Sequence, residues 1–128
     1  MYLRLESQEG FLEATVTGRV LLDEAIGVFK SIFDAAAERG FDKILVDCFA
    51  VEGELSTFQR YELGRTLAEY SLIRSRNLKV ATVGKLPTMD GFAEQVASNR
   101  GLFAQFFLER QAAVNCLNAF SPKSHLRI

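Results

Sequence analysis

The sequence predicts a small α/β domain with a mixed five-stranded sheet, and three observations lead to this fold class. Residues 43–49, Lys-Ile-Leu-Val-Asp-Cys-Phe, are almost continuously apolar, as expected for a strand that is covered on both faces. Two segments with period-two alternation precede this run, and segments with helical periodicity alternate with short apolar runs after it. We therefore expect residues 43–49 to form the central strand, flanked by helices.

Length and composition agree with one folded domain. The chain has 128 residues, of which 48% are hydrophobic and 24% charged, and these values are ordinary for a soluble globular domain. The net charge of -1 and the isoelectric point of about 5.9 offer no basic surface for nucleic acid or for an anionic membrane. Because the sequence contains neither a membrane-spanning apolar run nor a signal-peptide pattern, we expect a cytoplasmic protein.

The cysteine and histidine content does not predict metal or disulfide chemistry. Cys48 and Cys116 fall in apolar segments, and an intracellular chain with few cysteines keeps them as small buried hydrophobes. His125, the only histidine, follows Pro122 in a polar tail, where a metal ligand or general base would be poorly positioned. We expect no metal, no cofactor and no catalytic residue.

The first half of the chain predicts a hairpin and a helix before the central strand. Residues 1–7 and 11–17 alternate polar and apolar side chains around a short glycine-containing turn, which indicates two antiparallel strands. From Asp23 the apolar spacing becomes helical, with Asp23 as the expected cap and Gly40 in the left-handed position after the helix. The strand, helix, strand order then predicts a parallel pairing with residues 43–49.

An irregular stretch from Ala50 to Leu55 separates the central strand from the next helix. Ser56 followed by Gln59 matches a capping box, so we expect this helix to begin at Ser56 and to continue to about Arg76. Its apolar side chains spread around more of the helix than one sheet contact covers, which indicates a hydrophobic pocket or a subunit interface, and we favour the interface. Gly64 in its interior indicates either close packing against a neighbour or simple tolerance.

The rest of the chain predicts two more strands and two more helices. We expect strands at residues 78–83 and 102–108, and helices from Thr88 or Asp90 to Arg100 and over residues 109–120. In the third helix Phe92, Val96 and Ala97 are expected to face inward. The predicted order is β, β, α, β, α, β, α, β, α in one domain of residues 1–120, followed by a tail of residues 121–128.

This order, together with several short motifs, resembles the STAS fold. The motifs are Lys43-Ile-Leu-Val-Asp at the central strand, Gly91-Phe92-Ala93 before a helix that ends with Asn99-Arg100-Gly101, and a final strand that leads into Ala112-Ala113. More narrowly, the chain is similar to the bacterial branch grouped with anti-sigma-factor antagonists and with CRAL-TRIO lipid carriers. The resemblance covers residues 1 to about 120.

The resemblance makes Ser56, with Thr57 beside it, a candidate phospho-acceptor or anion-binding site. In the antagonist family, a partner kinase phosphorylates a serine at the start of the helix after the central strand, and the added charge switches partner binding. A helix amino terminus offers free N–H groups and a favourable dipole to a phosphate. Because nine positions separate Asp47 from Ser56 and no glycine follows, the Asp-Ser-Gly-like turn of the family is absent, and an ordinary N-cap serine is the alternative.

Asp47, Phe58 and Tyr61 are candidate loop or interface residues. Asp47 lies near the carboxyl end of the expected central strand, where ligands of open α/β sheets bind. It could act as an acid or a base, or it could accept backbone N–H bonds and order the following loop. The segment 84–88 lacks the spaced glycines of a phosphate loop, and we expect it to be a connecting loop.

These observations predict a non-enzymatic, regulatory protein-interaction module that binds a protein partner and forms a homodimer. The surface around residues 50–57 and the following helix would carry the contact. The alternative is a small apolar-ligand or lipid-binding protein with a cavity between that helix and the sheet. A hydrolase or transferase is not expected, because a nucleophile, a base and an orienting group cannot be assembled from these residues.

Overall fold

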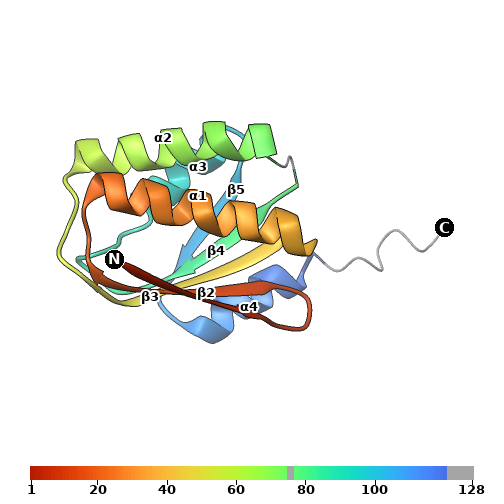
Figure 1. Cartoon of the computed structure of the whole chain (residues 1–128). Helices are drawn as coiled ribbons and strands as arrows, with labels where there is room; N and C mark the ends of the chain where they lie inside the picture. Colours follow the sequence, from red (N-terminus) through yellow and green to blue (C-terminus); the bar gives the residue numbers. More distant parts are fainter. Residues whose placement is uncertain (75–76, 121–128) are drawn as a thin grey trace.

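A computed structural model of the chain (Figure 1) describes residues 1–74 and 77–120. The elements are β1 Tyr2–Ser7, β2 Leu12–Arg19, α1 Leu22–Arg39, β3 Lys43–Glu52, α2 Thr57–Arg74, β4 Lys79–Val83, α3 Phe92–Asn99, β5 Phe103–Phe107 and α4 Arg110–Asn118. The number, type and order of the elements are those predicted, so the fold class is confirmed. The predicted tail at residues 121–128, which contains His125, lies outside the described residues, as does Arg76.

The five strands lie in the order β1-β2-β3-β4-β5, with β3 in the centre as predicted. β1 pairs antiparallel with β2, and every later pair is parallel. Because the three parallel crossovers all step in the same direction across the sheet, α1, α2 and α3 lie on one face. Only α4, after the last strand, packs on the opposite face (Figure 1).

Each face of the sheet has its own hydrophobic core, and the central strand contributes to both. Ile44 and Val46 face α1 to α3, and Leu45 between them faces α4. The core under the three helices is the larger and includes the fully buried Ile32 and Phe33 of α1. The almost unbroken apolar run in β3 therefore has the predicted cause, which is burial on both sides.

The central strand is longer than predicted. β3 continues to Glu52, so half of the expected irregular stretch belongs to the sheet. The pairing with β2 shifts register between Thr15 and Thr17, where β3 contributes one extra residue, and pairing then resumes to Arg19. A bulge of this kind bends the strand without ending it. The strand therefore continues beyond its continuous apolar run, and the apolar run alone predicted an end that came too early.

Two helix starts differ from the prediction. α1 has Leu21 as its N-cap, without a side-chain capping bond, and Asp23 lies in the first turn, where its charge still favours the helix dipole. α3 begins at Phe92, which is 38% exposed rather than inward, because this first residue lines the groove between α3 and β5. The other two residues predicted to face inward in α3 are buried. The end of α1 agrees with the prediction, because Gly40 follows the helix in the left-handed conformation, with φ of 78°.

α2 packs against both α1 and α3. A Cβ atom at Gly64 would lie 2.4 Å from the backbone oxygen of Ala93 and 2.9 Å from Cβ of Val96. The helices α2 and α3 therefore approach too closely at Gly64 to leave room for a side chain, and the close packing considered for this residue is confirmed. Contact with two helices also accounts for part of the wide apolar surface of α2.

Candidate functional site

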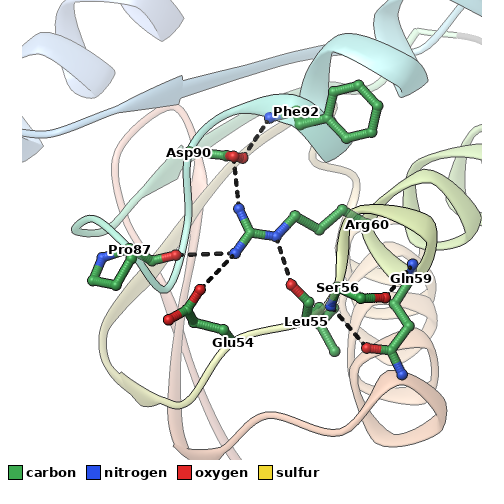
Figure 2. Close-up of polar contacts among 8 residues, drawn as sticks. All are labelled: Glu54, Leu55, Ser56, Gln59, Arg60, Pro87, Asp90 and Phe92. Atoms are coloured by element: carbon green, nitrogen blue, oxygen red, sulfur yellow. Dashed lines mark hydrogen bonds and ion pairs between the residues drawn. The ribbon is translucent and has the colours of Figure 1, made fainter.

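The segment between β3 and α2 is fixed at the start of the helix by the predicted capping box (Figure 2). The backbone N–H of Gln59 donates to Oγ of Ser56 at 3.1 Å, and the backbone N–H of Ser56 donates to Oε1 of Gln59 at 2.9 Å. Two N–H groups that the helix leaves free are thereby satisfied. Ser56 is thus an N-cap residue, which was the alternative to a phospho-acceptor or anion-binding site in the sequence analysis.

Arg60, on the first turn of α2, joins this segment to the loop before α3 (Figure 2). Its Nε donates to the backbone oxygen of Leu55 at 2.9 Å, and its Nη2 donates to the backbone oxygen of Pro87 at 3.0 Å. Nη1 lies 2.7 Å from a carboxylate oxygen of Asp90, and Nη2 lies 3.7 Å from Glu54. The Arg60 side chain is only 12% exposed, so these bonds are sheltered and charge-assisted.

Asp90 anchors the other side of this network. Its Oδ1 accepts a hydrogen bond from the backbone N–H of Phe92 at 3.0 Å, at the start of α3. This bond, followed by the bond and the charge of Arg60, holds the pKa of the Asp90 carboxyl below its usual range despite partial burial. One ion pair therefore holds the starts of α2 and α3 together.

Three consecutive exposed residues, Ser56, Thr57 and Phe58, lie on this fixed backbone. The Phe58 side chain is 68% exposed, although aromatic rings usually contribute to a core. Tyr61 is instead tied to α3, because its hydroxyl accepts a hydrogen bond from Nη2 of Arg100 at 2.8 Å, and that guanidinium lies 5.6 Å from the ring centre. The structure thus brings Ser56, Thr57 and Phe58 together and assigns Tyr61 to a helix contact.

The other exposed apolar residues of α2 lie at its opposite end. Leu72 is 42% exposed and Ile73 is 81% exposed. Fifteen positions separate Phe58 from Ile73, and this corresponds to roughly 22 Å along a helix. The exposed apolar side chains of α2 therefore form two separate patches, one at each end of the helix, rather than one continuous face.

A cavity of about 80 Å³ lies between α1, α2, α3 and the carboxyl ends of the strands. Its wall is mostly apolar and includes Phe29 and Leu63, with Arg60, Asp90 and Glu94 as charged side chains. A second cavity of about 40 Å³ shares Phe29, Leu63 and Glu94 with the first. This position agrees with the cavity expected between the helix after the central strand and the sheet, and it is the end of an α/β sheet where ligands bind.

Glu94, in the first turn of α3, lines both cavities. The buried hydroxyl of Thr82 on β4 donates to its Oε2 at 2.6 Å. Burial raises the pKa of the Glu94 carboxyl, and the negative charge of Asp90 adds to this rise, whereas the Thr82 bond opposes it. In the part of the chain that the structure describes, no lysine or arginine forms an ion pair with this carboxylate.

Cys48 contributes a neutral sulfur to the wall of the larger cavity. It is buried, as predicted, and burial raises the pKa of its thiol far above the ordinary value, with the nearby charge of Glu94 acting in the same direction. The thiol is therefore protonated and unsuited to nucleophilic attack. Cys116 is also a free thiol but is only partly buried, so the expectation of burial is met for one of the two cysteines.

Comparison with solved structures shows which known fold this arrangement shares. An anti-sigma factor antagonist from Mycobacterium paratuberculosis superposes with a TM-score of 0.64 at 14% identity, over 91% of this chain and 93% of that chain. The chain has a STAS-like fold. An uncharacterized protein of the DUF3478 family with a SpoIIAA-like fold, from Shewanella loihica PV-4, is also similar, with a TM-score of 0.53 at 17% identity, over 91% of this chain and 92% of that chain.

Sequence comparison adds nothing to this likeness, because no protein-family model and no curated protein matches the chain. At these identities the superpositions establish the fold of the STAS-like domain and leave its function to be argued from its own residues.

Asp47 of the STAS-like domain lies inside β3 rather than at its end, because β3 extends five residues beyond it. Its Oδ1 accepts the backbone N–H of Phe49 at 3.0 Å, at the bulge where the pairing with β2 shifts. The predicted bond to the backbone is therefore present, but it orders the strand and not a following loop. Leu45, two residues earlier, faces α4, so Asp47 lies on the face of the sheet opposite the cavity.

The segment 84–88 connects β4 to α3, as expected. Within the described residues 1–74 and 77–120, no group of three or more His, Cys, Asp or Glu side chains is placed to hold a metal ion. No helix in that part of the STAS-like domain has both the length and the apolar character needed to cross a membrane.

Sequence reasoning missed Arg60 and Glu94. The partners of Arg60 are two backbone carbonyls and the carboxylates of Glu54 and Asp90. Asp90 lies 30 positions away in the chain, and no spacing pattern predicts such a contact. Glu94 had a weak signal, because it precedes the inward-facing Ala97 by three positions and so shares its side of the helix.

Proposed function

We propose that this STAS-like domain is a non-enzymatic, cytoplasmic protein-interaction module with a regulatory role, and that residues 56–58 form its contact surface. The observation that supports this proposal most directly is the exposed Phe58 ring on a backbone fixed by hydrogen bonds. Exposed aromatic side chains are common anchors in protein interfaces. A neighbour in fold is an anti-sigma factor antagonist, a protein whose name describes action on another protein.

The fixed backbone favours binding. Association is weakened by the entropy lost when loops and side chains become ordered at an interface. Here the capping box and Arg60 already hold the backbone of residues 54–60 in place, so a partner would order little more than the Phe58 ring. A rigid helix start that presents one large aromatic side chain is therefore well suited to reversible recognition.

Ser56 and Thr57 supply a site for regulation of this contact. Both hydroxyls are on exposed residues directly before or at the start of α2, where free N–H groups and the helix dipole favour a phosphate. A phosphate on either residue would place about two negative charges beside Phe58. We expect phosphorylation to weaken binding of an apolar or acidic partner surface and to strengthen binding of a basic one.

Photo-crosslinking in the cells of origin tests the proposed contact. A photoreactive phenylalanine analogue at position 58 is expected to trap one discrete partner, and the same analogue at Ile73 serves as the matched control because that residue is even more exposed, at 81% against 68%. The substitution Phe58→Ala is expected to remove the complex. Identical products from both positions, or a discrete product only from position 73, would refute the proposed surface.

The same experiment tests the proposed homodimer. A crosslinked product that contains two copies of this chain would identify the partner as a second protomer. Light scattering behind size exclusion then gives the mass in solution, and we expect twice the 14.3 kDa of one chain. A monomer at concentrations up to roughly 100 μM would exclude a dimer of typical stability.

The small volume of the cavity argues against the lipid-carrier alternative. The larger cavity, of about 80 Å³, has roughly half the volume of an engineered cavity of 150 Å³ that binds benzene. A fatty acyl chain does not fit in such a volume. An apolar ligand bound there would have to be much smaller than a lipid.

A further inference from the structure

One carboxylate at the cavity, that of Glu94, forms no ion pair with a described residue. The other charged groups of the lining already have partners, because Arg60 and Asp90 lie 2.7 Å apart and the amino group of Met1 lies 2.9 Å from Glu24. Glu94 itself accepts hydrogen bonds from the Thr82 hydroxyl and from its own backbone N–H, and the charge of Arg60 acts on it without direct contact.

The apolar wall determines what else can occupy the space. Phe29, Val51, Leu55 and Leu63 line the larger cavity, and the protonated Cys48 thiol adds a neutral, weakly polar surface. An ionised carboxylate beside apolar side chains is costly unless a cation or several hydrogen-bond donors approach it. The chemistry of the site therefore fits a ligand with one positively charged, hydrogen-bonding group and a short apolar body.

We infer that the cavity is a binding site for a small organic cation, an ammonium group on an apolar body of about three carbon atoms, with Glu94 as its anion partner. The volume of about 80 Å³ is roughly half that of an engineered cavity that binds benzene, so we expect a ligand with fewer non-hydrogen atoms than benzene. This inference is independent of the contact proposed for residues 56–58.

The position of Glu94 also gives such a ligand a route from solvent. Asp90 and Glu94 line the larger cavity and also the open groove of about 560 Å³ between α3 and β5. The start of α3 therefore lies between the groove and the cavity. The ammonium group would replace the water that solvates the carboxylate, and the carbon chain would lie between Phe29 and Leu63.

A titration followed by nuclear magnetic resonance tests this site with two probes of nearly equal shape. The full ¹⁵N-labelled chain is unfolded, refolded to remove any co-purified molecule, and titrated at constant ionic strength with n-propylammonium chloride or with 1-propanol. We expect saturable shifts of the backbone signals of Val51, Ala93 and Glu94, with n-propylammonium binding about tenfold more tightly than the neutral alcohol. Equal affinities, or shifts that do not saturate at these residues, would overturn the inference.

Two variants test the charge of Glu94 and the volume of the cavity separately. Glu94→Gln keeps the shape of the side chain and is expected to abolish the preference for the cation while the rest of the spectrum stays unchanged. Ala25→Val adds two methyl groups to the wall of the cavity from α1 and is expected to weaken both probes about equally. Retention of the cation preference in Glu94→Gln would contradict the role of Glu94, and undiminished binding to Ala25→Val would place the probes outside the cavity.

Discussion

The two faces of the sheet are covered in opposite ways. Three helices cover one face, and a single helix of nine residues, α4, covers the other. The thickly covered face nevertheless contains cavities of about 80 and about 40 Å³. Cover by three helices has therefore not excluded cavities from that face, which is also the one that carries the candidate sites.

Two carboxylates, the buried one of Glu13 and the partly buried one of Glu94, also differ between the faces. Glu13, on the face covered by α4, is 8% exposed and is held by Arg110, with 2.7 Å between Oε1 and Nη2, and by Gln8 at 3.2 Å. Glu94, on the opposite face, has the hydroxyl of Thr82 and no ion pair among the described residues. The charge of Glu13 is used to attach α4 to the sheet, whereas the charge of Glu94 is available to a ligand.

The largest effect is expected on the thinly covered face, from Leu117→Ala. Leu117 of α4 is fully buried, and one helix cannot easily collapse into the space it would leave, so we expect a loss of about 3 kcal/mol in the free energy of unfolding. Leu63→Ala is the matched variant on the other face, where the side chain is partly buried and already borders a cavity. Urea denaturation should show a clearly smaller loss for Leu63→Ala, and equal losses would remove the contrast between the faces.

The next effect is expected from Gly64→Ala, where α2 and α3 of the thickly covered face are in close contact. The added Cβ would meet the backbone oxygen of Ala93 at 2.4 Å, so α2 and α3 must separate, and we expect a destabilisation of about 2 kcal/mol. Gly27→Ala in α1 is the control, because nothing lies within 4 Å of its added Cβ. That variant should be stabilised by about 0.5–1 kcal/mol through helix propensity. Stabilisation of both variants would show that the helix contact at Gly64 is not tight.

A smaller effect is expected when Arg110 is replaced by Ala. The change leaves Glu13 without its cation, but the Arg110 side chain is 48% exposed and solvent can replace part of the interaction, so we expect a loss of about 1 kcal/mol. The double variant Glu13→Gln with Arg110→Ala should recover part of this loss, because no unpaired charge then remains. A double variant as unstable as the sum of the two single changes would mean that the two side chains do not interact.

The smallest effect, and the one with the clearest signature, is the pH dependence of Glu94→Gln. Burial raises the pKa of the Glu94 carboxyl in the folded state, so the folded protein binds its proton more tightly than the unfolded chain does. Stability from this residue is complete below the ordinary carboxyl pKa of about 4.3 and is lost as the pH rises through the raised value. Glu94→Gln should therefore be more stable than the wild type at neutral pH, and the difference should disappear in acid.

Asp90→Asn is the control, because its effect on stability at neutral pH is expected to have the opposite sign to that of Glu94→Gln. The Phe92 N–H and Arg60 lower the pKa of the Asp90 carboxyl, so its contribution is present above the ordinary value and is lost as the pH falls through the lowered one. Asp90→Asn should be less stable than the wild type at neutral pH, with the difference closing in strong acid. Thermal unfolding at a series of pH values measures both variants, and parallel curves for all three proteins would contradict the environments described for the two carboxyls.

The fold could be predicted from the sequence because it depends on repeated local signals. Alternation in residues 1–17, helical spacing after Asp23 and the apolar run at residues 43–49 each reflect burial averaged over many side chains. Ser56 and Gln59 were also predictable, because both partners of a capping box lie within one helical turn.

The candidate site was predictable only in part, because its key contacts join residues far apart in the chain. Arg60 bonds to Pro87 and Asp90, and the cavity has a wall built from several elements that only the folded chain brings together. The extension of β3 was missed for a related reason, since a bulge against β2 is a property of two strands and not of one.

The sheet order has a consequence for how the chain folds. Each strand pairs with the strand that precedes it in the sequence, so a chain that emerges from the ribosome offers every new strand an edge that is already formed. Pairings between sequence neighbours keep the relative contact order low for a mainly parallel sheet, and low contact order is associated with fast folding. Stopped-flow refolding from urea should accordingly show a main phase in the millisecond range, and a main phase of many seconds would mean that another step limits the rate.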